Sequence, residues 1–180
     1  MIDKSKFRNE RIEFMDWLLI EKFLSSGQAF VPVNIENKGD SVHLYYQDGT
    51  NEVLDMKSTL FLSKLLHYFG TSVSANRNRY GKLIGRNQLV PLILSYGITF
   101  VPYVVRESIG SQIGWVRAKE ISGFQKKEKD KTFIQLSQHK ICVMHSEKFC
   151  LDQLKNARCI ELCYGEIHEP HRRKWLLTVG

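Results

Sequence analysis

A cationic stretch at residues 74–86, SANRNRYGKLIGR, has the side-chain chemistry of a surface that binds phosphate groups. It contains four lysines and arginines and no acid, and clustered cations bind polyanions because they displace the counterions around phosphates. Asparagine amides in and directly after it can donate or accept hydrogen bonds at base edges. The candidate nucleic-acid contacts are therefore Arg77, Arg79, Lys82, Arg86, Asn76, Asn78 and Asn87.

The positive charge of the chain is concentrated around this stretch. The formal net charge is +7, and residues 56–106 contain seven of the 26 lysines and arginines but no Asp or Glu. The other 19 cations are matched by all 19 acids of the chain. Lys64 lies in the same acid-free window and could widen the cationic surface. A polyanionic partner is favoured over the alternative, a basic surface that is only solvated.

The usual patterns of catalytic and metal sites are missing from the sequence. GKLIGR lacks the spacing of a phosphate-binding loop, no G-x-S-x-G occurs, and the acid-free window offers no carboxylates. The four cysteines include no C-x-x-C pair, and neither Cys142 with His139 and His145 nor Cys159 with Cys163 has a common zinc spacing. We predict free thiols, no bound metal, no cofactor and no catalytic site.

The elements that must position the cations indicate an α+β fold, mainly antiparallel, in a single domain. Apolar periodicity predicts helices at 8–25, 58–69, 72–84 and 146–162, with Ser58 capping the second. A strand is predicted at QAFVPVNI, and Asp48-Gly49 predicts a hairpin between SVHLYYQ and NEVLDM. LVPLIL with ITFVPYVV, and the two halves of KTFIQLSQHKICVMH, predict two more hairpins. GFQKKEKDK is predicted to be a charged loop.

The cationic stretch is expected to open a helix. Gly70 suits the end of the preceding helix and Ser72 the N-cap of the next. Helical spacing then turns an apolar side inward (Val73, Tyr80, Leu83 and Ile84). It also places three of the four cations on one stripe at i, i+3 and i+7 (Arg79, Lys82 and Arg86). An extended strand, the alternative, would instead put Arg77 and Arg79 on one face.

Three regions are expected along the chain. Residues 1–27 form an amphipathic N-terminal helix, 28–165 the main domain, and 166–180 a basic tail. The N-terminus lacks the apolar centre of a signal peptide, and no run of about 18 apolar residues is present. We therefore expect a cytoplasmic protein without a membrane partner.

The order of the motifs resembles the competence transcription factor family (ComK-like). The resemblance is carried by HYFGTSVSANR, then QLVPLIL and ITFVPYVV, then SQIGWV, then SEKFCLDQLKNA, and it spans about residues 60–162. It implies an activator of DNA-uptake genes that binds A/T-rich boxes of double-stranded DNA, largely through the minor groove. It also implies a homodimer or tetramer on DNA, and a protease adaptor as a further partner.

Two other functions are alternatives to DNA binding. A protein-interaction module of the same fold that does not bind DNA would use the apolar N-terminal helix, with Phe14, Trp17 and Leu18, or the WLL tail. An enzyme acting on nucleic acid would need carboxylates brought in from elsewhere in the fold.

Overall fold

A six-stranded antiparallel sheet organises the protein, with the strand order β3-β2-β1-β6-β5-β4. The computed structural model describes residues 16–36, 39–105 and 112–168. A second antiparallel sheet has the order β7-β8-β9. The strands are β1 (Gly27–Ile35), β2 (Gly39–Tyr46), β3 (Asn51–Leu54), β4 (Leu92–Ser95), β5 (Ile98–Val104), β6 (Ile113–Arg117), β7 (Gly123–Glu128), β8 (Lys131–Gln135) and β9 (Lys140–Val143).

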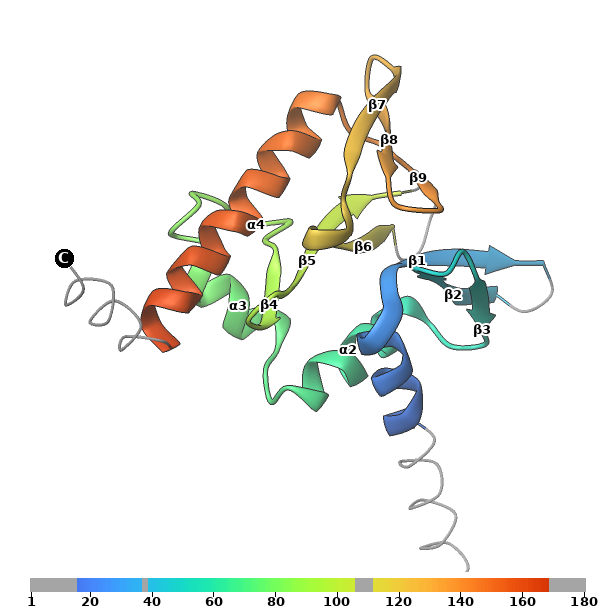
Figure 1. Cartoon of the computed structure of the whole chain (residues 1–180), viewed down its shortest axis with the longest axis horizontal. Coiled ribbons are helices and arrows are strands. Elements are labelled where there is room, and N and C mark those ends of the chain that lie inside the picture. Colours follow the sequence, from blue (N-terminus) through green and yellow to red (C-terminus); the bar gives the residue numbers. More distant parts are fainter. Residues whose placement is uncertain (1–15, 37–38, 106–111, 169–180) are drawn as a thin grey trace, which may run out of the picture.

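Helices and the small sheet cover the two faces of the large sheet. The helices are residues 16–26, α2 (Ser58–Tyr68), α3 (Val73–Tyr80) and α4 (Glu147–His168), with a 3-10 turn, η1, at Ala118–Glu120. Figure 1 shows residues 16–26 and α2 below the large sheet, β7–β9 above it, and α4 running down the left side past β4. The predicted α+β architecture is confirmed. Within the described ranges, no helix combines the length and hydropathy needed to span a bilayer.

Alternation along the strands creates a separate core on each face of the large sheet. Because successive strand residues point to opposite faces, Phe30 and Phe100 pack with residues 16–26 and α2, whereas Val101 and Tyr103 face α4 and the small sheet. All four of these side chains are buried. Both faces of the sheet are therefore covered by apolar packing, so α4 is held firmly on the same side as the small sheet.

The N-terminal helix belongs to the main core. Phe23 is fully buried, and its ring lies 5.2 Å from Phe61 and 5.7 Å from Phe30, measured between centroids. The helix is confirmed over residues 16–26, and positions 8–15 lie outside the described residues. Ile20 and Phe23 point inward, whereas Trp17 and Leu18 are 48% and 45% exposed.

The hairpins predicted from local turn signals are present. β2 pairs with β3 across Asp48-Gly49, and β4 pairs with β5 across residues 96–97. The expected loop at 123–131 is wrong, because residues 123–128 form β7 and pair with β8. This strand is exposed along most of its length and carries two adjacent lysines, so its sequence shows no apolar alternation. The expected cap at Ser58 is also wrong: Lys57 occupies the N-cap and Ser58 is buried.

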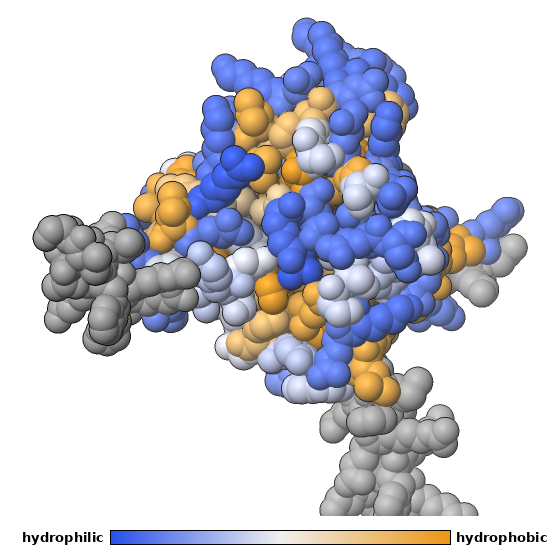
Figure 2. Space-filling model, in the orientation of Figure 1, coloured by the Kyte–Doolittle hydropathy of each residue, from blue (hydrophilic) through white to orange (hydrophobic). Residues whose placement is uncertain are grey.

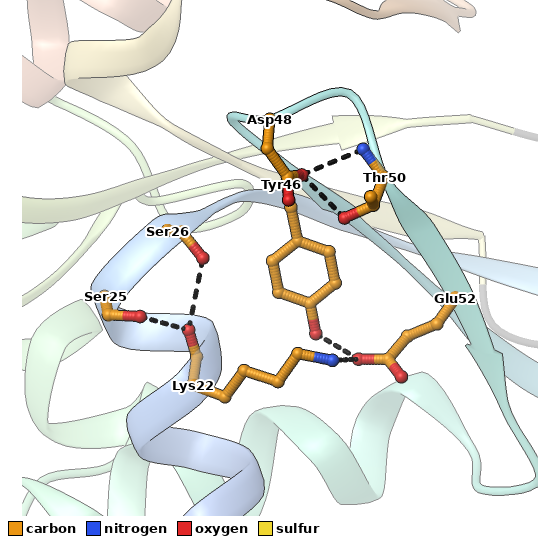
Figure 3. A network of polar contacts seen from close by, with 7 residues as sticks. All are labelled: Lys22, Ser25, Ser26, Tyr46, Asp48, Thr50 and Glu52. Carbon is orange, nitrogen blue, oxygen red and sulfur yellow. Dashed lines mark hydrogen bonds and ion pairs between the residues drawn. The ribbon is translucent and has the colours of Figure 1, made fainter.

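A polar network fastens the N-terminal helix to the β2–β3 hairpin (Figure 3). Lys22 Nζ lies 2.8 Å from Glu52 Oε1 and 4.8 Å from the centroid of the Tyr46 ring, and the Tyr46 hydroxyl donates to the same carboxylate. Burial alone would raise the pKa of Glu52, but the hydrogen bonds from Lys22 and Tyr46 hold it below its usual value. The ionised carboxylate is thus the form that the fold favours.

Replacing Phe23 by Ala is expected to destabilise the protein by about 3–5 kcal/mol, because it removes a fully buried ring and leaves a cavity. Leu18→Ala on the same helix is the matched control and should change the free energy of unfolding by no more than about 0.5 kcal/mol, since Leu18 is 45% exposed. Urea unfolding followed by circular dichroism measures both. Equal effects would contradict the packing of this helix into the core.

The Glu52 network predicts a pH dependence of stability. A carboxyl group whose folded pKa is lowered stabilises the fold above its unfolded pKa, about 4.3, and this contribution is lost as the pH falls through the folded value. Glu52→Gln should therefore lower stability at pH 7 and flatten the acid side of the stability curve. Urea midpoints between pH 3 and pH 7 test this, and an unchanged slope for the variant would contradict it.

Candidate nucleic-acid interface

Local signals place α3 as the sequence predicts. Gly70 has φ +65°, a left-handed conformation that suits glycine, and it ends α2. The hydroxyl of Ser72 then accepts a hydrogen bond from the backbone N–H of Ala75 at 3.1 Å, which caps the first turn of α3. The predicted helix is confirmed, although α3 ends at Tyr80 rather than at residue 84.

The chain turns tightly after α3. The backbone N–H of Arg86 donates to Gly81 O at 2.8 Å, and a Cβ on Gly81 would lie only 2.5 Å from Arg86 O. Glycine is therefore required where the chain folds back on itself. Lys82 and Arg86 consequently lie in turns beyond the helix, so the expected single helical stripe with Arg79 is not formed.

The inward side of this segment is partly as expected. Tyr80 is 3% exposed and packs with Val90, Ile93 and Ile160, which joins α3 to β4 and α4. Leu83 was expected to face the core but is 47% exposed, because α3 has already ended and the turn carries Leu83 outward. Tyr80 is thus a core residue, and its buried ring is not available to stack on a base.

Asn76 must be removed from the candidate contacts. Its side chain is 3% exposed, and its Oδ1 accepts a hydrogen bond from the backbone N–H of Ile93 at 2.9 Å. Its Nδ2 donates to Thr71 Oγ1 and to Ser72 O, both at 3.2 Å. The amide therefore ties α3 to β4, and a base edge cannot reach it without breaking the fold.

Lys64 also departs from the expectation. Its ammonium group forms an ion pair with Asp16 of the N-terminal helix, and its side chain is 29% exposed. The carboxylate balances the charge of Lys64, so this lysine adds little to a cationic surface. It instead helps to join α2 to the helix at residues 16–26.

The remaining candidates lie at the surface. Arg77, Asn78 and Arg79 are three consecutive exposed residues of α3, and successive helical side chains fan out by about 100°. Lys82 and Asn87 are exposed in the turns that follow. Among the described residues, none of the arginines or lysines at positions 77, 79, 82 and 86 has an acidic partner. The segment therefore presents cations whose charge is not neutralised by nearby carboxylates.

Arg86 is placed differently from the other cations because it contacts α4. Its Cζ lies 4.9 Å from the centroid of the Phe149 ring, and the Phe149 ring stacks on His145 at 4.1 Å with an interplanar angle of 17°. His145 Nε2 accepts the backbone N–H of Val104 at 3.0 Å. Burial, and then the charge of Arg86, lower the pKa of His145, so its ring is held neutral.

Gln153 fixes the loop that leads from the cations into β4. Its side chain is fully buried, and its Nε2 donates to Leu89 O at 2.8 Å and to Pro102 O at 3.3 Å. Leu89 has φ +50°, an uncommon conformation for a leucine. Gln153 was not among the predicted site residues, and its signal in the sequence is a glutamine among the apolar positions of the helix predicted at 146–162.

The histidines and cysteines do not assemble a metal site in the described residues. No group of three or more His, Cys, Asp or Glu side chains is placed there to hold an ion. All four cysteines are free thiols, and burial raises the pKa of Cys150 to about 12. His145 acts as a hydrogen-bond acceptor for β5, and the ring of His139 lies beside Tyr45 and contacts Tyr46 O.

Comparison with known proteins gives no match to this chain among family models, curated proteins or solved structures.

The two asparagines of α3 should respond differently to substitution. Asn76→Ala is expected to destabilise the protein by about 1–3 kcal/mol, because it leaves the buried N–H of Ile93 without its acceptor. Asn78→Ala, at an exposed position of the same helix, should change the free energy of unfolding by less than about 0.5 kcal/mol. Chemical denaturation of the pair distinguishes them, and similar values would refute the structural role of Asn76.

Proposed function

We propose that this protein is a DNA-binding transcriptional activator of the competence type, acting in the cytoplasm as a homo-oligomer. The observation that carries the proposal is the exposed, acid-free set of cations on α3 and in the turns after it. Phosphates are the natural partners of such a set, because each Lys or Arg contact releases counterions. The motif order described above supplies the competence assignment, with A/T-rich boxes as the proposed target.

Only some of the candidate residues are proposed as the DNA contacts. Arg79 and Lys82 are the proposed phosphate contacts, and Arg77 with Asn78 would lie nearer the bases. An arginine side chain can enter a narrow minor groove, where the negative potential is strongest, and asparagine amides can sense A·T content there. Asn87 extends the surface beyond Arg86, whereas Asn76 and Lys64 are excluded by their internal partners.

A second function, a protein-interaction module, is favoured by one observation. Trp17 and Leu18 are 48% and 45% exposed on the N-terminal helix, although the core takes Phe23 from the same helix. The Trp17 ring packs on Tyr68 at 4.3 Å between centroids, so it is supported but still accessible. Exposed aromatic side chains of this kind are common at protein–protein contacts. This surface is compatible with DNA binding by α3 and does not require it.

The DNA proposal predicts the effect of removing two phosphate contacts. Arg79→Ala with Lys82→Ala should weaken binding to an A/T-rich duplex at ~150 mM salt and reduce the slope of log K against log salt by about 2. The matched control is Lys126→Ala with Lys129→Ala. It removes the same charge from the exposed β7–β8 hairpin, which Figure 1 shows far from α3.

Fluorescence anisotropy across a salt series gives both affinity and slope. Equal losses in the two double variants would mean that net charge, and not the α3 surface, governs binding. If the wild-type protein binds no duplex, the DNA proposal is refuted and the protein-interaction module becomes the favoured function. A G/C-rich duplex of equal length tests the preference for A/T-rich DNA, which should be bound more tightly.

A further inference from the structure

Arg86 is the only one of the four candidate cations that is half-buried; Arg77, Arg79 and Lys82 are exposed. Its guanidinium group lies over the Phe149 ring at 4.9 Å, within the range of a cation–π contact. Such a contact can use the face of the guanidinium plane and leave N–H groups at its edge free to donate. In the described part of the chain, no carboxylate pairs with it. Arg86 is therefore restrained and still able to bind an anion.

Phe149 is itself held on both its backbone and its ring. Its N–H donates to the Ser146 hydroxyl at 3.3 Å, which caps the first turn of α4. Its ring stacks on His145 at 4.1 Å. A ring with these two restraints is a fixed platform for Arg86, so the position of the guanidinium group is set by α4 as well as by its own turn.

His145 completes the stack because it is fixed in a neutral form. Its Nε2 accepts the N–H of Val104, and its backbone carbonyl accepts the hydroxyl of Thr132 at 2.8 Å. A protonated ring would lose the bond to Val104 and would place a second cation beside Arg86. Three elements, β5, β8 and α4, thus converge to hold one aromatic stack under one arginine.

We infer that Phe149 is a positioning residue that holds Arg86 in place as a pre-ordered phosphate contact, an inference that rests on the proposed DNA binding. An arginine that is already ordered loses less conformational freedom on binding than one that is free in solution. Phe149 lies within α4, whereas the proposed DNA contacts themselves lie in α3 and the turns that follow. The interface accordingly depends on α4 for the geometry of its last cation.

A double-mutant cycle between Arg86 and Phe149 tests this inference. Phe149→Leu should weaken binding to the duplex about 3-fold or more, whereas Phe149→Tyr, which keeps an aromatic face, should bind like the wild type. In an Arg86→Gln background, Phe149→Leu should have no further effect, because the contact that it positions is already lost. The melting temperature of each variant separates loss of folding from loss of positioning.

A measurement without DNA accompanies the cycle. The Nε–Hε resonance of Arg86 should show a ring-current shift in the wild type and in Phe149→Tyr that disappears in Phe149→Leu. If the two substitutions had independent effects on affinity that multiply, the positioning role would be overturned while DNA binding would stand. An Arg86 resonance that Phe149→Leu leaves unchanged would overturn the positioning role in the same way. A wild type that binds no DNA would instead overturn the proposed function, and the positioning inference with it.

Discussion

The buried amide of Gln153 is the interaction on which the arrangement of the cationic surface depends. β4 pairs with β5 only as far as Phe100, so Pro102, two residues further along, lies beyond the β4–β5 ladder, although it still pairs with Trp115 of β6. Gln153 donates to the carbonyl of Pro102 from α4 and, with the same nitrogen, to Leu89 just before β4. A fully buried amide must find such partners, because leaving them unmade costs about 1–3 kcal/mol. One side chain thus sets the positions of a helix, a strand and the approach to β4.

Inward contacts made by neighbouring residues of α3 explain how the cationic surface can be both exposed and well ordered. Asn76 and Tyr80 turn inward from α3 and join β4 and α4, while Arg77, Asn78 and Arg79 turn outward between them. The helix has only eight residues, too few to be stable alone. Its order comes from these inward contacts. The residues that fix α3 and the residues proposed to bind DNA are therefore neighbours with separate tasks.

Most features governed by neighbouring residues could be predicted from the sequence, although the cap expected at Ser58 is wrong. The turn at Asp48-Gly49, the helix end at Gly70 and the cap at Ser72 are all local, and all three are present. Features that depend on distant partners could not be predicted. The inward turn of Asn76 depends on the backbone N–H of Ile93, seventeen residues away, and the neutralisation of Lys64 depends on Asp16.

The same limit applies to the face of a helix and to an exposed strand. Helical spacing placed Trp17, Leu18 and Phe23 on one apolar face, yet of these three only Phe23 is buried, together with Ile20. β7 could not be recognised because its polar sequence has no apolar alternation. The strand is instead formed by its backbone pairing with β8. Of the candidate site, residue types and general exposure could be predicted, whereas the contact of Arg86 with Phe149 could not, because it joins positions far apart in the chain.

The lysines of β7 have a consequence for the behaviour of the protein in concentrated solution. β7 is an edge strand of the small sheet, and its unpaired backbone groups could add a strand from another molecule. Lys126 and Lys127 are exposed on this edge, and an approaching copy would bring like charges together. Part of the basic character of the chain therefore opposes fibrillar stacking through this edge. These lysines lie outside the acid-free window of residues 56–106, so this role is separate from the proposed binding surface.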